Sequence, residues 1–398
     1  MKTDNTETHT VGEIAEELYL QCIRCGKCLA VCPVYRETRI ETLSPRGRVA
    51  LYRAVGEKEL STSEVYANKF YTCLMCEACR EACPSGVQLD VILTQVRADV
   101  ARSGLLPDSL QRLDDTIIAA GNISGEANEQ RLGWTSNLES PPTGLDHDGQ
   151  AEVAYFVGCV SSLFPASYSI PQSLVQILER AGVNYALLGD EERCCGYPIY
   201  LNGEVERAAG LARRNIAAVR ETGASRVVMS CPSCYHMWTH TYPELLGEEA
   251  LDGIEIVHET ELLAELARAG RLPLKPWPVT VTYHDSCDLG RKSGTFEAPR
   301  DVLRAIPELE LVEMADHHEN SLCCGGGGNL ETYDRELAQA LPRRRLEQAQ
   351  DAGAKYTVVS CQQCKRTLFS AARREKIRVR TIDLSEVILR QLEEPSDD

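Results

Sequence analysis

The chain has 398 residues, a length that allows two or three domains. Its formal net charge of −17 argues against nucleic acid as a partner, because phosphate binding rests on clustered Lys and Arg. The amino terminus has no apolar segment followed by a cleavage site, and no apolar run approaches the roughly 18 residues that span a bilayer. We therefore expect a cytoplasmic protein whose eighteen cysteines stay reduced, and whose membrane association would come through a partner.

Residues 1–12 are polar and predict a disordered tail, and residues 13–120 predict an α-helical domain. This domain carries a C-x2-C-x2-C-x3-C-P run twice, and each cysteine of the second run follows its counterpart by 51 positions, as in 73 − 22. The pattern is typical of two-cluster bacterial ferredoxins, in which each 4Fe-4S cube takes three cysteines of one run and the fourth of the other. The predicted ligand sets are Cys22, Cys25, Cys28 and Cys83 for one cube, and Cys73, Cys76, Cys79 and Cys32 for the other. Two zinc sites are the alternative, but zinc usually takes two separated C-x2-C pairs.

The residues between and after the two runs predict helices at 46–55, 62–71, 87–102 and 105–120. Ser44 is a suitable cap and Pro45 suits the first turn. Arg46 and Arg48 either neutralise anionic thiolates or meet a partner, or they are simply exposed arginines on a capped helix. The all-α ferredoxin domain is thus expected to have a long helical insert between its two cysteine runs.

Residues 121–150 lack periodicity and are rich in Gly, Ser, Asn and Pro, which predicts a linker. Beyond it, short β-rich runs alternate with amphipathic stretches, which indicates βαβ units and a mainly parallel sheet. We expect two duplicated α/β lobes at 151–258 and 279–393, joined by a helix and a Pro-rich segment at 259–278 and followed by an acidic tail at 394–398. The overall prediction is an α+β multi-domain chain.

Each predicted lobe carries a Cys-Cys-Gly between an upstream cysteine and a downstream C-x2-C pair. Matched cysteines of the two lobes are separated by a nearly constant number of positions (287 − 159 = 128 and 323 − 194 = 129), which indicates an internal duplication. Four of these cysteine positions directly follow predicted strands. Because ligands of open α/β folds bind beyond the carboxyl ends of the strands, each set should converge on one site. The two sets are Cys159, Cys194, Cys195, Cys231 and Cys234, and Cys287, Cys323, Cys324, Cys361 and Cys364.

Five thiolates exceed the four that an ordinary cube takes, so either one cysteine is idle or the cluster is not a simple cube. A vicinal disulfide between adjacent cysteines is the other alternative, but it would be strained. The run Gly325 to Gly328 lets the backbone turn sharply and donate N–H groups to an anionic cluster, and it does not fit a phosphate-loop pattern. His284 donates to a cluster sulfur, relays protons or plays a structural role. The sequence does not identify the catalytic residues, which stay unknown.

Together these motifs resemble a family of iron-sulfur oxidoreductases that includes the glycolate oxidase and anaerobic glycerol-3-phosphate dehydrogenase iron-sulfur subunits and the heterodisulfide reductase subunits. The resemblance covers roughly residues 15 to 390. It implies an electron-transfer subunit with two 4Fe-4S cubes and one further cluster per lobe, noncubane in the heterodisulfide reductases. A flavin is expected on a partner, which would be a flavoprotein dehydrogenase or an electron-transfer flavoprotein, with a quinone-linked or membrane-anchor subunit as a further partner.

Three functional hypotheses follow. In the first, the chain passes single electrons between a flavoprotein dehydrogenase and a further acceptor. In the second, it reduces a disulfide directly at a carboxy-terminal cluster; here both five-cysteine sets are complete, whereas glycolate-type subunits often lack ligands in one, which favours this hypothesis. The third, a zinc-binding scaffold, is separated from both by metal analysis.

Overall fold

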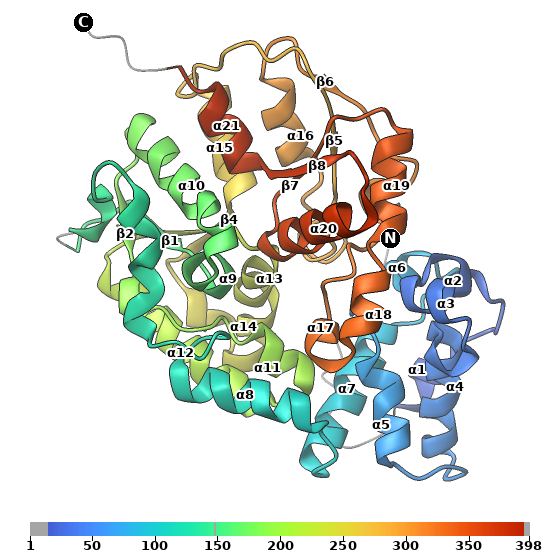
Figure 1. Cartoon of the computed structure of the whole chain (residues 1–398). Coiled ribbons are helices and arrows are strands. Elements are labelled where there is room, and N and C mark those ends of the chain that lie inside the picture. The colour runs from blue at the N-terminus through green and yellow to red at the C-terminus, as the bar shows by residue number, and fades with distance from the viewer. Residues whose placement is uncertain (1–14, 147–148, 394–398) are drawn as a thin grey trace, which may run out of the picture.

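The computed structural model describes residues 15–146 and 149–393. The predicted tails at 1–12 and 394–398 lie outside the described residues. The described chain combines helices with two parallel four-stranded sheets, an α+β architecture. Figure 1 shows a helical front portion in blue, followed by two sheet-containing lobes, one mainly green and one orange to red.

The front portion consists of short helices, and all its described regular elements are helical. The predicted start of the helix after the first cysteine run is confirmed: Ser44 Oγ accepts a hydrogen bond from the Gly47 N–H, and Pro45 occupies the first turn. The helices are α1 (Glu16–Leu20), α2 (Lys27–Val31), α3 (Pro33–Thr38), the 3-10 helix η1 (Glu41–Leu43), α4 (Pro45–Gly56), α5 (Glu64–Tyr71), α6 (Ala78–Glu81), α7 (Leu89–Arg102) and α8 (Asp108–Ala120).

The segment predicted as a linker is packed against the first lobe. It contains the 3-10 helices η2 (Asn128–Asn137) and η3 (Thr143–Leu145). Trp134 is fully buried in the hydrophobic core, and Arg131 is buried beside Glu192 and Cys159. Its composition does not indicate these contacts.

The two sheets have the same topology. The first has the order β2-β1-β3-β4 and the second β6-β5-β7-β8, with all pairs parallel. The sequence predicts β-rich runs at 153–157, 185–188, 227–229, 279–283, 309–312 and 356–359. Six strands match these runs, whereas the sequence pattern does not predict β4 and β8 at the sheet edges. The strands are β1 (Val153–Phe156), β2 (Tyr185–Leu187), β3 (Arg226–Met229), β4 (Glu255–His258), β5 (Thr280–Tyr283), β6 (Glu310–Leu311), β7 (Tyr356–Val359) and β8 (Arg380–Asp383).

Helices cover both sheets. In the first lobe they are α9 (Cys159–Leu163), η4 (Pro165–Ser167), α10 (Ser169–Arg180), η5 (Gly189–Glu191), α11 (Tyr197–Asn202), α12 (Val205–Glu221), α13 (Pro232–His236), the π-helix η6 (Met237–Thr241), α14 (Tyr242–Leu246), η7 (Glu248–Leu251) and α15 (Glu259–Arg268). In the second lobe they are α16 (Glu297–Arg304), η8 (His318–Asn320), α17 (Leu330–Tyr333), α18 (Arg335–Ala340), α19 (Arg343–Asp351), α20 (Gln362–Glu375) and α21 (Leu384–Gln391). The sequence pattern predicts a single helix near 331–351, which is wrong, because Asp334 leaves the helical conformation and Pro342 interrupts the next turn.

The two lobes pack through equivalent helices. α10 of the first lobe contacts α21 of the second, and α15 contacts α16. Both last helices begin with a capping box, His258 with Glu261 and Asp383 with Glu386. One hydrophobic cluster extends across both sheets, from Val153 and Leu174 to Val281 and Val387. The helix predicted to connect the lobes, α15, is therefore part of their shared core.

Candidate metal centres

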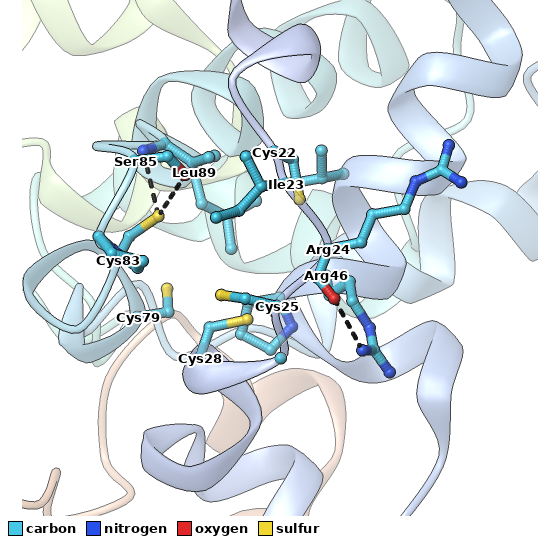
Figure 2. A pocket seen from close by; sticks show the side chains of 15 residues that line it. Cys22, Ile23, Arg24, Cys25, Cys28, Arg46, Cys79, Cys83, Ser85 and Leu89 are labelled. Atoms are coloured by element: carbon cyan, nitrogen blue, oxygen red, sulfur yellow. Dashed lines mark hydrogen bonds between the residues drawn. The ribbon is translucent and has the colours of Figure 1, made fainter.

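The first pocket of the front portion is lined by Cys22, Cys25, Cys28 and Cys83, the four cysteines that the spacing predicts for one cube. Cys79 also reaches this pocket, and Figure 2 shows the five sulfurs around it. Cys83 Sγ accepts a hydrogen bond from the Val87 N–H at 3.3 Å and lies 3.6 Å from Ser85 Oγ. These contacts support the anionic form of the sulfur, which is the form that binds metal.

A second pocket is lined by Cys32, Cys73, Cys76 and Cys79, the other predicted set. The backbone again donates to sulfur: Tyr35 N–H to Cys32 Sγ at 3.5 Å and Met75 N–H to Cys73 Sγ at 3.4 Å. Cys79 lines both pockets, so the two sites adjoin each other.

The five cysteines of the first lobe lie at the carboxyl ends of its strands. Cys159 is the first residue of α9, the helix that follows β1, and Cys231 is at the N-cap position of α13, the helix that follows β3. Sulfur contacts run from Cys159 to Cys194, from Cys195 to Cys194 and Cys234, and from Cys234 to Cys231. Hydrogen bonds from the Cys194 and Cys234 thiols lower the pKa of Cys195 to about 6, despite its burial.

The second lobe repeats this arrangement. Cys323 contacts Cys287 and Cys324, Cys324 Sγ lies 3.1 Å from Cys364 Sγ, and Cys364 contacts Cys361. The pKa of Cys324 is lowered well below its usual range by hydrogen bonds from the Cys323 and Cys364 thiols. In each lobe, contacts of this kind connect all five sulfurs of the set.

The glycine run after Cys323-Cys324 has two roles. The N–H groups of Gly325 and Gly326 point at Cys323 Sγ (3.5 Å) and Cys324 Sγ (3.4 Å), as the sequence predicts. The next two glycines lie against the front portion. A Cβ at Gly327 would be 2.7 Å from the Leu74 carbonyl oxygen, and one at Gly328 would be 2.7 Å from Leu74 Cα. Only glycine allows this approach.

The front portion and the second lobe meet at their cysteines. Cys76, of the second pocket, is hydrogen-bonded to Cys323, which lowers the pKa of Cys76 to about 6. Arg291 crosses the same boundary, donating to the Cys76 carbonyl at 2.7 Å and the Ser321 carbonyl at 2.5 Å. No motif or spacing in the sequence indicates this role of Arg291.

The two five-cysteine sets face one shared cavity of about 470 Å³. Nine of the ten cysteines line it, and Cys323 is the exception. Asp288 also lines the cavity, where it is held by Lys292 at 2.8 Å and by the hydroxyl groups of Tyr197 (2.9 Å) and Ser233 (2.5 Å). Sequence analysis missed this network because its members come from both lobes.

Charged side chains differ between the two lobes. In the first, the buried Arg131 guanidinium donates to Cys159 Sγ at 3.2 Å and pairs with Glu192 at 2.6 Å. In the second, the predicted candidate His284 contacts Cys324, and its Nδ1 accepts a hydrogen bond from Arg345 at 2.9 Å. Arg131 lies in the predicted linker, and the sequence pattern does not single it out.

The other candidates from the sequence have structural contacts. Arg46 lines the first pocket, whereas Arg48 is buried and donates to the Lys69 carbonyl at 2.7 Å. His258 caps α15.

The donor chemistry of these sites fits iron-sulfur clusters. All eighteen cysteines lie in the described residues and are free thiols, so the alternative of a vicinal disulfide does not hold here. Backbone N–H groups point at their sulfurs, as anionic sulfur requires. A contact network of five sulfurs also exceeds the four ligands of a tetrahedral zinc site.

Comparison with known families identifies the class of protein. Residues 19–87 match the 4Fe-4S dicluster domain, and residues 153–239 and 281–369 each match the cysteine-rich domain known as CCG. These matches define an iron-sulfur protein with two cysteine-rich repeats.

The relatives place it more closely. The chain is 31% identical over 367 residues to a subunit of the dihydromethanophenazine:CoB–CoM heterodisulfide reductase of Methanosarcina barkeri, covering 87% of each chain. It is 27% identical over 446 residues to the probable iron-sulfur-binding oxidoreductase FadF of Bacillus subtilis, covering 97% of this chain and 62% of that protein. It is also 27% identical over 353 residues to EtfAB:quinone oxidoreductase of Syntrophomonas wolfei, covering 79% of this chain and 49% of that protein. The chain belongs to the CCG-domain family of iron-sulfur oxidoreductases, which includes this heterodisulfide reductase component.

Among solved structures, a hypothetical protein from Helicobacter pylori has a similar fold, with a TM-score of 0.58 and 13% identity over 91% of this chain and 72% of that one. In the described residues, the helices are too short or too polar to serve as a membrane span.

Proposed function

We propose that this chain is the electron-transfer subunit of a multi-subunit oxidoreductase, relaying single electrons between a flavoprotein and a further acceptor. The observation that carries this proposal is the continuity of the four cysteine sites. Cys79 links the first two pockets, Cys76 and Cys323 join the front portion to the second lobe, and both lobes share one cavity.

In this proposal a ferredoxin-type front domain binds two 4Fe-4S cubes, and each of the two duplicated lobes binds one further cluster. When bound, these clusters would act as one-electron carriers. The residues of the chain hold them: the thiols bind, the backbone N–H groups stabilise the anionic sulfurs, and Arg291 fixes the boundary between front domain and second lobe.

The partner is inferred to be a flavoprotein dehydrogenase acting on a 2-hydroxy acid or glycerol 3-phosphate, or an electron-transfer flavoprotein. The relatives whose names include oxidoreductase and EtfAB support such an assembly. A flavin would deliver the single electrons that these sites accept. Contact with a membrane would come through a partner subunit.

A second candidate function is reduction of a disulfide in the shared cavity. The cavity between two complete five-cysteine sets favours it, because a substrate that entered there would meet the cysteine sites of both lobes. Two electrons and two protons would convert the disulfide into two thiols, with the electrons supplied by the reduced partner. One relative is named as a component of a heterodisulfide reductase.

Paired cysteine variants test the assignment of the sites. In Cys324→Ser, anaerobically purified protein should lose iron from the second lobe, while the electron paramagnetic resonance signals of the front cubes persist. Cys25→Ser should do the reverse. Unchanged iron content and spectra in Cys324→Ser would contradict the second-lobe site. Affinity purification from the native host, with flavin analysis of co-purifying subunits, tests the partner.

A further inference from the structure

Cys25 is the only exposed cysteine of the eighteen, all of which lie in described residues. It lines the first pocket of the front portion, which Figure 2 shows at close range. The lobe sulfurs are buried except for the half-buried Cys287. Because electron exchange weakens steeply with distance, a protein partner approaches a carrier most closely at this pocket.

The chain around Cys25 is basic although the protein is acidic. Residues 21–46 contain five basic and two acidic side chains, a net charge of +3 in a chain of −17, so the other residues together carry −20. Arg24, Lys27 and Arg39 are exposed. Three exposed basic side chains therefore belong to the segment that contains the exposed cysteine, and residues 362–380, with seven basic side chains and one acidic side chain, form a second basic segment.

Contacts of the Arg46 side chain hold this basic segment in place. Arg46 pairs with Glu41 at 2.9 Å and donates to the Arg24 carbonyl at 3.3 Å. Arg24 adopts a left-handed backbone conformation with φ of 58°. Figure 2 shows the Arg24 guanidinium directed away from the sulfurs, on the same side of the pocket as Arg46. The charge therefore faces outward next to the pocket.

Apolar side chains accompany these charges. Ile23 is 66% exposed and lines the same pocket, and Leu20 is 57% exposed at the end of α1. Charged residues that surround a small apolar contact are typical of surfaces that bind partners transiently.

We propose that the surface formed by Leu20, Ile23, Arg24, Lys27 and Arg39, here called the Cys25 surface, docks an acidic flavoprotein that exchanges electrons at the first pocket. This inference rests on the proposed electron-transfer function. The exposed Arg24, Lys27 and Arg39 attract an acidic partner, so charge favours an acidic flavoprotein over a basic one at this surface.

The test uses the full chain loaded with iron and sulfide, with flavodoxin hydroquinone as an acidic flavoprotein probe. Stopped-flow absorbance gives the second-order rate constant of electron transfer to the protein. For the wild type this constant should fall at least tenfold between low salt and about 0.5 M salt, because salt screens the attraction. In Arg24→Glu/Lys27→Glu/Arg39→Glu the constant at low salt should be at least tenfold lower than in the wild type.

A matched variant makes the same charge change elsewhere. Arg112, Arg213 and Arg214 are exposed on α8 and α12, in the part of the molecule opposite α2 and α3 in Figure 1. Arg112→Glu/Arg213→Glu/Arg214→Glu should change the rate constant less than twofold. An equal decrease of the rate constant in both triple variants would overturn the docking surface and indicate an effect of net charge.

Reduction by dithionite separates this proposal from the function on which it rests. Both triple variants should keep the wild-type iron content and be reduced by dithionite to the same extent. Normal dithionite reduction together with a salt-independent flavodoxin rate in the wild type would overturn the Cys25 surface and leave the electron-transfer function standing. Failure of dithionite to reduce the loaded wild type would overturn both.

Discussion

At the scale of single residues, the two lobes differ in the charges that reach equivalent cysteines. In the first lobe, Arg131 donates directly to Cys159 Sγ at 3.2 Å. In the second, Cys287 Sγ lies 3.8 Å from the Asp288 carboxylate, which Lys292 neutralises at 2.8 Å. A cation hydrogen-bonded to sulfur stabilises the more negative, reduced state of a bound cluster. We therefore expect Arg131 to raise the reduction potential of the first-lobe site.

Arg131→Gln should lower the midpoint potential of the first-lobe cluster. Losing one charge-assisted hydrogen bond of about 1.5–3 kcal/mol corresponds to roughly 60–130 mV for a one-electron couple. Potentiometric titration followed by electron paramagnetic resonance measures the shift. Arg131→Lys, which keeps the charge near Glu192, should shift the potential less, and the exposed Arg112→Gln should not shift it. A potential unchanged in Arg131→Gln, with full iron content, would contradict this role.

At the scale of elements, the sequence predicts the parts that carry a local periodic signal. The buried strands β1, β3, β5 and β7 are runs of apolar and β-branched residues, and the cysteines directly after them fall where predicted. The edge strands β4 and β8 escape prediction because they mix apolar with polar residues, as in Arg380-Thr-Ile-Asp.

The contacts of the 121–150 segment depend on partners far along the chain. Arg131 reaches Glu192, 61 positions away, and Trp134 enters a core built by both lobes. A 3-10 helix of ten residues with mixed polarity has no periodic pattern that would indicate burial. The role of Arg131 at Cys159 could therefore be inferred only from the three-dimensional structure.

The glycine run provides an element-scale prediction. Gly328→Ala should destabilise the protein by more than about 2 kcal/mol, because φ is +67° and the new Cβ would meet the Cys73 and Leu74 backbone, which cannot rotate away. We expect the melting temperature to fall by at least about 2 °C, because the unfolding entropy scales with the 398 residues of the chain. The control is Gly353→Ala, with φ of +74° but open space around the Cβ, which should cost only about 1–2 kcal/mol. An equal loss of stability in both variants would show that backbone strain alone, without contact to the front portion, explains the effect.

At the scale of the whole molecule, the spacing of the cysteines predicts two similar lobes but not how they face each other. Their orientation follows from helix contacts that join α10 to α21 and α15 to α16, and from one shared hydrophobic core. Gln362 of the second lobe reaches across to the first, donating to the Val157 carbonyl at 2.9 Å and to Ser230 Oγ at 3.1 Å. The shared cavity is a consequence of this arrangement, which no local pattern encodes.

The two candidate functions make different demands on that cavity, because a disulfide must enter it whereas electron relay does not require an open path. Thr332 is exposed and lines the cavity, so Thr332→Trp should narrow it without touching a cysteine. The neighbouring Glu336 is exposed but is not among the lining residues, which makes Glu336→Trp the matched control. With reduced methyl viologen as donor and 2-hydroxyethyl disulfide as substrate, the disulfide function predicts at least tenfold slower turnover in Thr332→Trp and wild-type turnover in Glu336→Trp. Iron content and reduction by dithionite should be unchanged in both variants. Full turnover in a loaded Thr332→Trp protein would place disulfide reduction outside the cavity, and no turnover in the loaded wild type would leave electron relay as the function of the chain.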